Sequence, residues 1–405
     1  IPESENVKVA NMTLTGGYSE GHGCSGGGGL LVTADDMTNL DFFDVRQNNA
    51  VLENLIVEDN HSHNGGGVSF FRVAGAVVDN VIARNNQATF NGGGFFVYCS
   101  EVSMSNIEAN GNTVLGYNMG NGNLAYGGGI FLAGVEGTIT NATILNNTAI
   151  DGGGLATTGS GNTWTMTNST VSGNTSSSNG GGMFFIDEAQ PTLSNVTLEN
   201  NTAGRGGGIS VGTATPVFQG CAFTGNSSTS ALSGGGAVYI FNEFDWSTFE
   251  HKQGSWPVFT DCTMTGNTAV NNGGAVNFAN PSAMYGTPDG ATLKRVLIAQ
   301  NESGDYCGGV NVSGGTAKIT NCTIVDNVTG HSSQYGSGGV DINWGGVAII
   351  TNSIIRNNAN FFGWEIVPNY SSVSLNYNNV FNPLEWGIGN INVDPQAIER
   401  IMNNL

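Results

Sequence analysis

The chain has 405 residues, 63 of them glycine, and 11 Lys and Arg stand against 31 Asp and Glu, a formal net charge of −20. This excess of negative charge makes nucleic acid and anionic membrane surfaces poor partners. No run of apolar residues is long enough to span a bilayer, so we expect no membrane insertion. Calcium ions, cationic polymers or simple colloidal solubility fit the composition, and no other cofactor is expected.

Two short patterns alternate along the chain. Eleven runs of two to four glycines, from Gly26–Gly29 to Gly338-Gly339, each lead directly into an apolar segment. Upstream of nearly every run is an eight-residue segment that ends in Asn, from Asn60 to Asn358. The terminal Asn residues are most often roughly 25 to 27 residues apart, which is the spacing of a solenoid repeat.

Within each segment the third and fifth residues are apolar or small and their neighbours are polar, as for Leu55 and Val57 or Val196 and Leu198. This alternation predicts a strand with one face in a core. A repeat of this length is too short for two strands and a crossover helix, which need about 30 residues. We therefore expect a strand, a turn, a second strand and another turn in each repeat, with successive repeats stacked in parallel.

The predicted fold is an all-β, single-domain right-handed parallel β-helix of about a dozen coils. The repeat domain covers residues 1–358, with insertions at 241–256 and 279–292, and residues 359–405 form a closing coil and a C-terminal cap. In the cap, Asp394 and Pro395 can begin a short helix. At the other end, Ile1 to Ala10 runs into the first strand with nothing to cover it. We expect self-assembly or a neighbouring domain at this N-terminal edge.

The terminal Asn and the glycine runs predict two kinds of corner. Asn readily takes a left-handed conformation, so the Asn column marks a sharp turn whose amides can hydrogen-bond along the stack. Glycine runs suit a tighter corner, where positive φ or close backbone contact excludes a Cβ. A phosphate-binding loop would have to lead into a helix, and none of these runs does.

Asn-x-Ser/Thr triplets give candidate glycosylation sites at Asn141, Asn168, Asn195, Asn226 and Asn321. In a secreted eukaryotic protein several of them would carry glycans. A chain this rich in Asn, Ser and Thr also produces such triplets by chance, so both interpretations stay open.

Cys221 and Cys262 fall in the same inward column of successive coils. Neighbouring coils are within the Cα distance that a disulfide allows, roughly 4.4–6.8 Å. A ladder of buried thiols is the alternative. No Cys-x-x-Cys and no His-rich metal spacing is present, so no metal site is predicted.

The pairing of Gly-Gly-Ala-Val, as at Gly273-Gly274-Ala275-Val276, with Phe-x-x-Asn, as at Phe223-Thr224-Gly225-Asn226, resembles the repeat of polymorphic outer-membrane protein passenger domains and related surface β-helices. The tail from Gly387 to Gln396 is similar to segments that close such domains. Members are mostly adhesins, surface filaments or proteins of unknown role. The resemblance therefore implies a non-catalytic structural or adhesive protein that is extracellular or on a cell surface.

An enzyme is the alternative, because polysaccharide lyases and glycoside hydrolases also use β-helices. Hydrolysis needs two carboxylates facing one groove, about 5 to 9.5 Å apart. Adjacent acids such as Asp35-Asp36 occur, but no motif places a base beside clustered Lys and Arg, of which only Lys294 and Arg295 are adjacent. We assign no catalytic residues.

The two insertions are rich in aromatic residues and belong to neighbouring coils, so stacking should bring them together. The resulting candidate binding residues, for a glycan or a surface protein, are Phe241, Phe244, Trp246, Phe249, Trp256 and Tyr285. Exposed aromatic side chains on inserted loops form contact surfaces. A lid that covers the coil with its own small core is the alternative.

Overall fold

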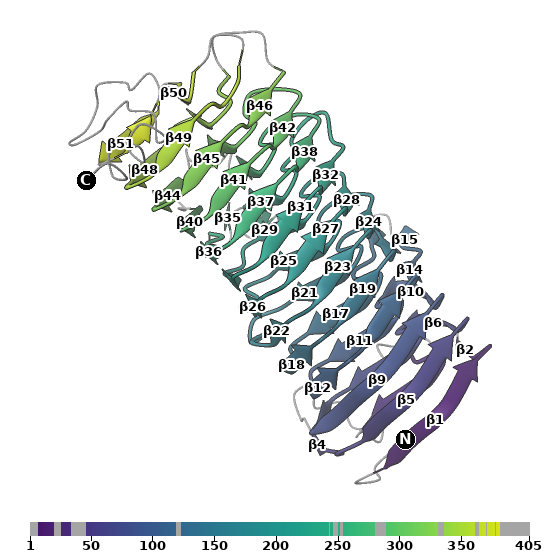
Figure 1. Cartoon of the computed structure of the whole chain (residues 1–405). Helices are drawn as coiled ribbons and strands as arrows, with labels where there is room; N and C mark the ends of the chain where they lie inside the picture. The colour runs from purple at the N-terminus through teal and green to yellow at the C-terminus, as the bar shows by residue number, and fades with distance from the viewer. Residues whose placement is uncertain are drawn as a thin grey trace, which may run out of the picture. The chain divides into compact units, whose positions relative to one another are not determined.

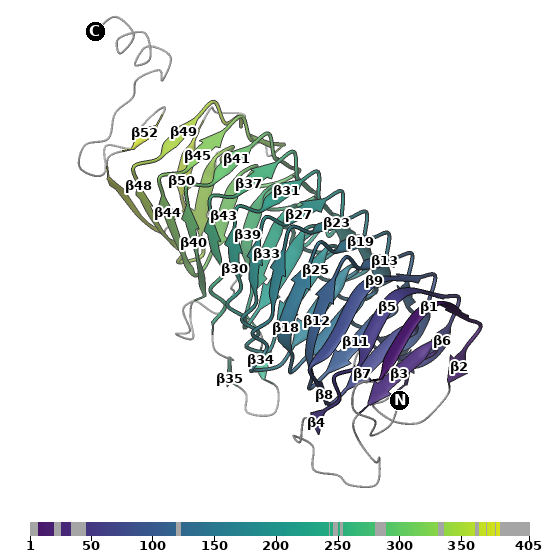
Figure 2. The same ribbon diagram turned by 60° about the horizontal axis from the view of Figure 1, so that its bottom comes forward.

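The computed structural model describes residues 7–19, 26–33, 46–118, 123–242, 244–245, 250–251, 254–279, 289–330, 336–360, 364–369, 371–376 and 378–380. The chain divides into two compact units, Ile1–Ala222 (unit 1) and Phe223–Leu405 (unit 2), and each is described by itself. Both consist of stacked β-coils (Figures 1 and 2). The described residues include no helix, and hence none that is long and apolar enough to cross a membrane.

One coil of unit 1 shows the construction. It contains β18 (Glu136–Thr140), β19 (Thr143–Leu145), β20 (Thr148–Ala149) and β21 (Leu155–Thr158). β18 and β19 lie in one sheet (sheet A), β20 in a second (sheet B) and β21 in a third (sheet C). The predicted two strands per repeat are therefore wrong, since this coil has four strands, and the coils that begin with β5 (Val51–Glu58) and β9 (Ala76–Arg84) have one strand in each of the three sheets. The short sheet B strand escapes detection because two residues cannot display an alternation.

All three sheets of unit 1 are parallel, and each strand pairs with the equivalent strand of the next coil. Sheet A also contains β1 (Lys8–Thr15), β5 (Val51–Glu58), β9 (Ala76–Arg84), β12 (Glu101–Ser105), β13 (Glu108–Asn110), β22 (Thr165–Thr167), β23 (Thr170–Ser172), β26 (Thr192–Ser194), β27 (Thr197–Glu199) and β30 (Val217–Gln219). Sheet B contains β2 (Tyr18–Ser19), β6 (His61–Asn64), β10 (Gln87–Asn91), β14 (Thr113–Val114), β24 (Thr175–Ser176) and β28 (Thr202–Ala203). Sheet C contains β3 (Leu30–Thr33), β7 (Val68–Phe71), β11 (Phe95–Tyr98), β17 (Ile130–Ala133), β25 (Met183–Ile186) and β29 (Ile209–Gly212). Two small sheets join β4 (Arg46–Gln47) to β8 (Val73–Ala74) and β15 (Tyr117–Asn118) to β16 (Asn123–Leu124).

Unit 2 repeats this arrangement, and β31 (Ala222–Thr224) lies at the boundary between the units. Its sheet A contains β36 (Val258–Thr260), β37 (Thr263–Thr265), β40 (Gly290–Lys294), β41 (Leu297–Ala299), β44 (Thr316–Thr320), β45 (Thr323–Val325), β48 (Val347–Thr351), β49 (Ile354–Arg356), β51 (Ser372–Asn376) and β52 (Asn379–Val380). Sheet B contains β32 (Ser227–Ser228), β38 (Thr268–Ala269), β42 (Glu302–Ser303) and β46 (Val328–Thr329). Sheet C contains β33 (Val238–Phe241), β39 (Val276–Ala279), β43 (Val310–Ser313), β47 (Val340–Asn343) and β50 (Ile366–Pro368). β34 (Phe244–Asp245) and β35 (Glu250–His251) form an antiparallel hairpin.

The core is built from the inward columns that the alternation predicts. Leu55, Val57, Val196 and Leu198 are all at most 1% exposed. Sheet C has seven described strands in unit 1 and five in unit 2, in agreement with about a dozen coils. The all-β parallel β-helix is thus confirmed, and its core consists of apolar ladders that run from coil to coil.

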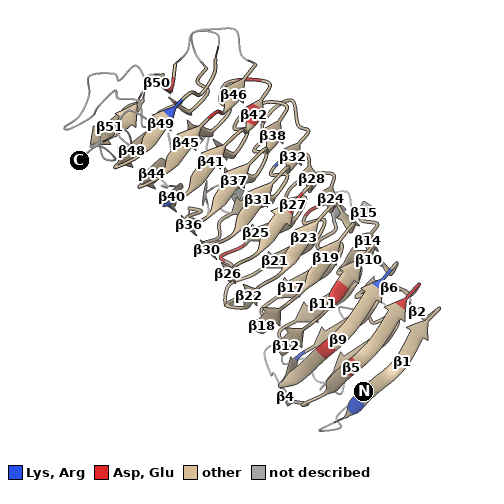
Figure 3. Ribbon diagram, in the orientation of Figure 1, with Lys and Arg blue, Asp and Glu red and all other residues tan. Residues whose placement is uncertain are grey.

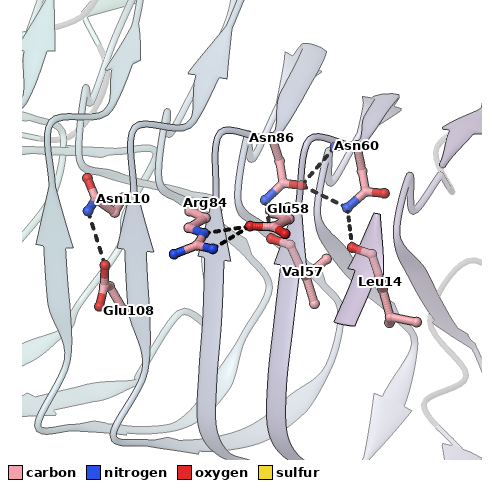
Figure 4. A network of polar contacts seen from close by, with 8 residues as sticks. All are labelled: Leu14, Val57, Glu58, Asn60, Arg84, Asn86, Glu108 and Asn110. Atoms are coloured by element: carbon pink, nitrogen blue, oxygen red, sulfur yellow. Dashed lines mark hydrogen bonds and ion pairs between the residues drawn. The ribbon is translucent and has the colours of Figure 1, made fainter. Parts of the chain in front are cut away.

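The terminal Asn residues form a buried amide ladder in each unit. Every Nδ2 donates to the Oδ1 of the Asn in the following coil, as from Asn60 to Asn86 at 3.0 Å (Figure 4) and from Asn147 to Asn174 at 2.9 Å. In unit 1 the ladder runs through Asn60, Asn86, Asn112, Asn147, Asn174 and Asn201. In unit 2 it runs through Asn226, Asn267, Asn301, Asn327 and Asn358.

The amide ladder was predicted correctly, but the left-handed conformation was assigned to the wrong residue, the terminal Asn. Positive φ belongs to the residue before it, as at Asp59 (φ 55°) and Asn146 (φ 54°). The left-handed residue turns the chain, so the Asn that follows can point inward and reach the next coil. A second left-handed column, with Asn141 and Asn168 among its members, separates the two sheet A strands of the four-stranded coils.

The glycine runs occupy corners where the backbones of neighbouring coils meet. In the run at Gly273 and Gly274, the first residue has φ 65°, and a Cβ on the second would lie 2.3 Å from the carbonyl oxygen of Gly308. No side chain fits there. This confirms the prediction that these corners require glycine.

The two ends of the stack differ in what the structure describes. β1 pairs with β5 along one side, and no strand pairs with its other side among the described residues. At the far end, β51 and β52 pair with β48 and β49, so the coils continue beyond residue 358. The predicted cap helix at Asp394 and Pro395 lies outside the described residues.

Candidate functional site

The predicted aromatic site is only partly within the described residues. Trp246, Phe249 and Tyr285 lie outside them, and for Phe244 only its place in β34 is described. Phe241 ends the sheet C strand β33, where its ring stacks on that of Tyr239 with centroids 5.4 Å apart. Phe241 is therefore half-buried against its own strand.

Trp256 lies over sheet A of unit 2, just before β36. Its indole Nε1 donates to the Thr292 hydroxyl at 3.1 Å, and a Cβ on Gly290 would lie 2.5 Å from the indole ring. The ring thus covers β40 closely. The Lys318 ammonium, on β44, lies 4.9 Å from the ring centroid, a cation–π contact. The hydrogen bond to Thr292 and the close packing of the ring on β40 fix the orientation of this half-buried tryptophan.

Two exposed lysines are near neighbours on this face. Lys318 is the register partner of Thr292, and Lys294 lies two residues further along the strand that carries Thr292. Alternate residues of a strand point to the same side, so Lys294 and Lys318 project from the same face of adjacent strands. We call the face formed by Trp256, Thr292, Lys294, Lys318 and Thr320 the basic face.

An acid on the bend of the neighbouring coil is paired with an arginine. Arg295, which follows β40, holds Asp261 with two hydrogen bonds, Nε to Oδ1 at 2.5 Å and Nη2 to Oδ2 at 2.7 Å. This pairing raises the pKa of Arg295. Among the described residues no acid forms an ion pair with Lys294 or Lys318, and both residues are exposed.

Charge is distributed differently on sheet A of the two units. In unit 2 all four described Lys and Arg residues lie on this sheet or its bend (Lys294, Arg295, Lys318 and Arg356). In unit 1 most of the charged residues on the strands of sheet A are acids (Glu53, Glu58, Asp79, Glu101, Glu108, Glu136 and Glu199), and Figure 3 colours the acids red. Lys8 and Arg84 in unit 1 pair with Glu53 at 2.5 Å and Glu58 at 2.6 Å (Figure 4).

Buried acids form a second polar feature of unit 2. On the outer face of sheet C, the amide of Asn343 donates to Asn311 and that of Asn311 to Asn277. Asp341 is fully buried beside them and accepts a hydrogen bond from the Asn369 amide at 3.2 Å. Burial raises the pKa of Asp341 to about 8. Before β40, burial raises the pKa of Asp289 to about 6, although its carboxylate accepts from the Ser255 backbone at 2.7 Å.

The candidate glycosylation sites divide into two groups. Asn141, Asn168, Asn195 and Asn321 are exposed in the left-handed column of sheet A. Asn226 is a fully buried member of the unit 2 amide ladder, so this candidate is wrong. A glycan on its Nδ2 would displace the hydrogen bond to Asn267.

Of the two alternatives for Cys221 and Cys262, a disulfide or buried thiols, the structure contains thiols. Cys221 and Cys262 are both buried at their predicted inward positions, and neither is in a disulfide. The Cys221 thiol donates to the Leu193 carbonyl at 3.5 Å, and the Cys262 thiol to the Thr260 carbonyl at 3.2 Å. Within the part of the chain that the structure describes, no group of three His, Cys, Asp or Glu side chains could hold a metal ion.

Comparison with known proteins agrees with the fold. A family model described as a right-handed beta helix region matches residues 118–251. The chain is thus similar, over about a third of its length, to a class that includes both adhesive or structural proteins and carbohydrate-active enzymes. None of the curated proteins and none of the solved structures compared with the chain matches it.

The sequence analysis missed the lysine pair. It treated the basic residues as scattered, because Lys294 and Lys318 are far apart along the chain. The signal was nevertheless present: Thr292-Leu293-Lys294 and Lys318-Ile319-Thr320 occupy equivalent positions in successive repeats. Aligning the repeats residue by residue places both lysines on one face.

Proposed function

We propose that this chain is a non-catalytic structural or adhesive protein that acts outside the cell or on its surface. The observation that carries the proposal is the amide ladder. Its Asn residues are buried and use their amides to join one coil to the next. Such a ladder stabilises a scaffold, and its own amides are occupied by these hydrogen bonds. The resemblance to surface β-helix repeats supports the same conclusion.

The edge of β1 supports assembly as part of this role. An edge strand presents backbone groups that can pair with another chain. We propose that a second copy or a neighbouring domain covers this edge.

Hydrogen exchange tests the assembly proposal, with the interior strand β23 as an internal control. In the isolated chain, β1 amides should exchange much faster than β23 amides; in native material, β1 should be protected while β23 is unchanged. Light scattering after size-exclusion chromatography should give a larger mass for the native material. Equal β1 exchange in both samples, with a monomeric mass, would contradict covered β1 edges.

A carbohydrate-active enzyme is the second candidate, and the buried acids of unit 2 favour it. An acid with a raised pKa can serve as a proton donor at neutral pH. Reducing-end and unsaturated-product assays on neutral and acidic glycans test it, with Asp289→Asn and Asp341→Asn as variants. We expect no turnover. Turnover that either variant abolishes would establish an enzyme and overturn the proposal.

Calcium binding and glycosylation stay predictions. Isothermal titration of the purified chain with CaCl2 tests the first. Mass spectrometry of native material tests the second at Asn141, Asn168, Asn195 and Asn321.

A further inference from the structure

The basic face is a place where this acidic chain presents positive charge in a fixed arrangement. Strands lie about 4.8 Å apart and successive residues advance about 3.3 Å, so the Cα atoms of Lys294 and Lys318 are roughly 8 Å apart. The ammonium of Lys318 is held over Trp256, and Trp256 is itself held by Thr292. Less side-chain entropy is therefore lost when Lys318 meets a ligand.

The hydroxyls on the basic face add hydrogen-bonding groups between the charges. Thr292 adjoins Lys318 across the strand pair, and Thr320 is the register partner of Lys294. The indole Nε1 already uses Thr292 as an acceptor, which leaves that hydroxyl's proton to donate. Ammonium groups with neighbouring hydroxyls can bind a carboxylate or sulfate and the sugar hydroxyls beside it.

We propose that the basic face of unit 2 binds an anionic polysaccharide, one that bears carboxylate or sulfate groups along a linear chain. This inference rests on the adhesive part of the proposed function and names its ligand class. A linear polymer suits a sheet surface, since successive anionic groups can meet Lys294 and Lys318 on adjacent strands. The density of charge distinguishes this ligand from nucleic acid: a duplex carries a charge every ~1.7 Å, and the net charge of −20 opposes so dense a polyanion.

The test uses the 405-residue chain and biolayer interferometry with three probes: polygalacturonate for carboxylate, κ-carrageenan, a linear galactan with one sulfate per disaccharide, for sulfate, and dextran as the neutral control. We expect binding to at least one anionic probe, none to dextran, and weakening as salt rises. The double variant Lys294→Gln/Lys318→Gln should bind at least tenfold more weakly. Trp256→Leu, which releases Lys318, should weaken binding several-fold, and Trp256→Phe less.

The matched control is Lys8→Gln/Arg84→Gln, which changes the net charge by the same amount from exposed positions of unit 1. It should bind within about twofold of the wild type. An equal loss of binding in both double variants would show that only the net charge matters, and would overturn the proposal. So would failure to bind either anionic probe, or equally tight binding of a DNA duplex. Thermal melting confirms that every variant is folded.

Two outcomes separate this inference from the proposed function. Cleavage of a bound probe, followed by product assay, would overturn the non-catalytic role while the basic face stands. If the probes are neither bound nor cleaved while the β1 edge is protected in native material, the proposal for the basic face is overturned and the proposed structural role stands.

Discussion

The outer face of sheet C has different chemistry in the two units at equivalent strand positions. In unit 1 the second residues of β11 and β17, Phe96 and Phe131, stack with centroids 5.5 Å apart. In unit 2 the second residues of β39 and β43, Asn277 and Asn311, join through their amides at 2.7 Å, and the second residue of β47 is the buried acid Asp341. Sheet A differs in the same way, being acidic in unit 1 and basic in unit 2.

The inward columns, by contrast, have the same chemistry in both units. Inward side chains pack on one another within a coil and against the neighbouring coils, so the coil spacing limits their size and hydrogen bonding. Outward side chains meet no such limit. We call the inward columns and the amide ladder the frame. The comparison shows that the frame is the same in both units, while the outward side chains can differ and serve different functions.

The largest expected effect falls on the shared frame and should be the same in both units. Asn174→Ala in unit 1 and Asn301→Ala in unit 2 each leave several buried groups without partners, including the Ile144 or Met264 carbonyl. At about 1–3 kcal/mol for each unpaired group, we expect a loss of roughly 3–6 kcal/mol, measured by chemical unfolding. Asn168→Gly is the control, since Gly220 occupies the equivalent exposed position; its effect should be below about 1 kcal/mol. Unequal losses in the two units would show that the frame is not shared.

The glycine corners give the next effect. Gly274→Ala places a Cβ 2.3 Å from the Gly308 carbonyl oxygen, where only backbone movement can make room. We expect a loss of about 3 kcal/mol, at the upper end for overpacking. Gly266 presents the opposite case: its φ is 64°, which is unfavourable for a side chain, but a Cβ added there would have no other atom within 4 Å. Gly266→Ala should cost only about 1–2 kcal/mol, and similar melting curves for both variants would contradict the crowding argument.

The buried acid Asp341 should make the stability of unit 2 sensitive to pH. The folded pKa of Asp341, about 8, lies above the value near 3.9 expected when unfolded. Between these values the folded state holds a proton that the unfolded state has lost. The contribution of Asp341 to the free energy of unfolding should therefore be fully present below pH 4. It should fall as the pH rises towards 8, by at most about 1.4 kcal/mol per pH unit.

Asp341→Asn removes this dependence because its amide cannot ionise. The variant should melt at a higher temperature than the wild type at pH 8 and show a shallower slope between pH 5 and pH 8. Asp289→Asn should act over a lower range, from about pH 4 to its folded pKa of about 6. Parallel wild-type and Asp341→Asn profiles would mean that Asp341 is ionised when folded.

The smallest effect concerns the aromatic face of unit 1. Phe131→Leu keeps an apolar side chain but removes the ring that stacks on Phe96, at a cost of about 1 kcal/mol. The loss should be the same at pH 5 and pH 8, in contrast to Asp341→Asn. If the loss of stability in Phe131→Leu depended on pH, the outer faces of sheet C in the two units would not differ in their response to pH.

The frame was predictable from sequence because every coil repeats it. Alternation at Leu55 and Val57 identifies the inward columns, and the recurring Asn identifies the ladder. The position of positive φ was not predictable in the same way. Asn occurs at three kinds of position in a coil: in the ladder, directly before the ladder residue, and in the second left-handed column. The residue type alone does not tell these positions apart.

The outward faces were harder to predict because they lack repetition. Trp256 was predicted in a cluster with other aromatic residues of the insertions, and most of those lie outside the described residues. Its contact with Lys318 depends on a coil-to-coil register that the insertions at 241–256 and 279–292 obscure. Asp341 gave no signal, because an acid in a strand is usually exposed and only the loops around sheet C decide its burial.

The amide ladder also has a direction. In every step described, Nδ2 donates towards the higher-numbered coil and Oδ1 accepts from the lower-numbered one. The amide dipoles of each unit are therefore aligned head to tail, as peptide dipoles are in an α-helix. In unit 1 the negative end, the Asn60 Oδ1, accepts from the backbone of Gly17 at 2.8 Å.

In unit 2 the positive end meets a carboxyl group. The amide of the last ladder residue, Asn358, donates to Glu365 Oε2 at 2.6 Å, and Glu365 is 3% exposed. Burial raises the pKa of this acid, while its bonds to Asn358 lower it. Glu365 thus ends the side-chain ladder of unit 2 as an acidic residue caps a helix N-terminus, and the aligned amides give this unit a polarity along its stack of coils.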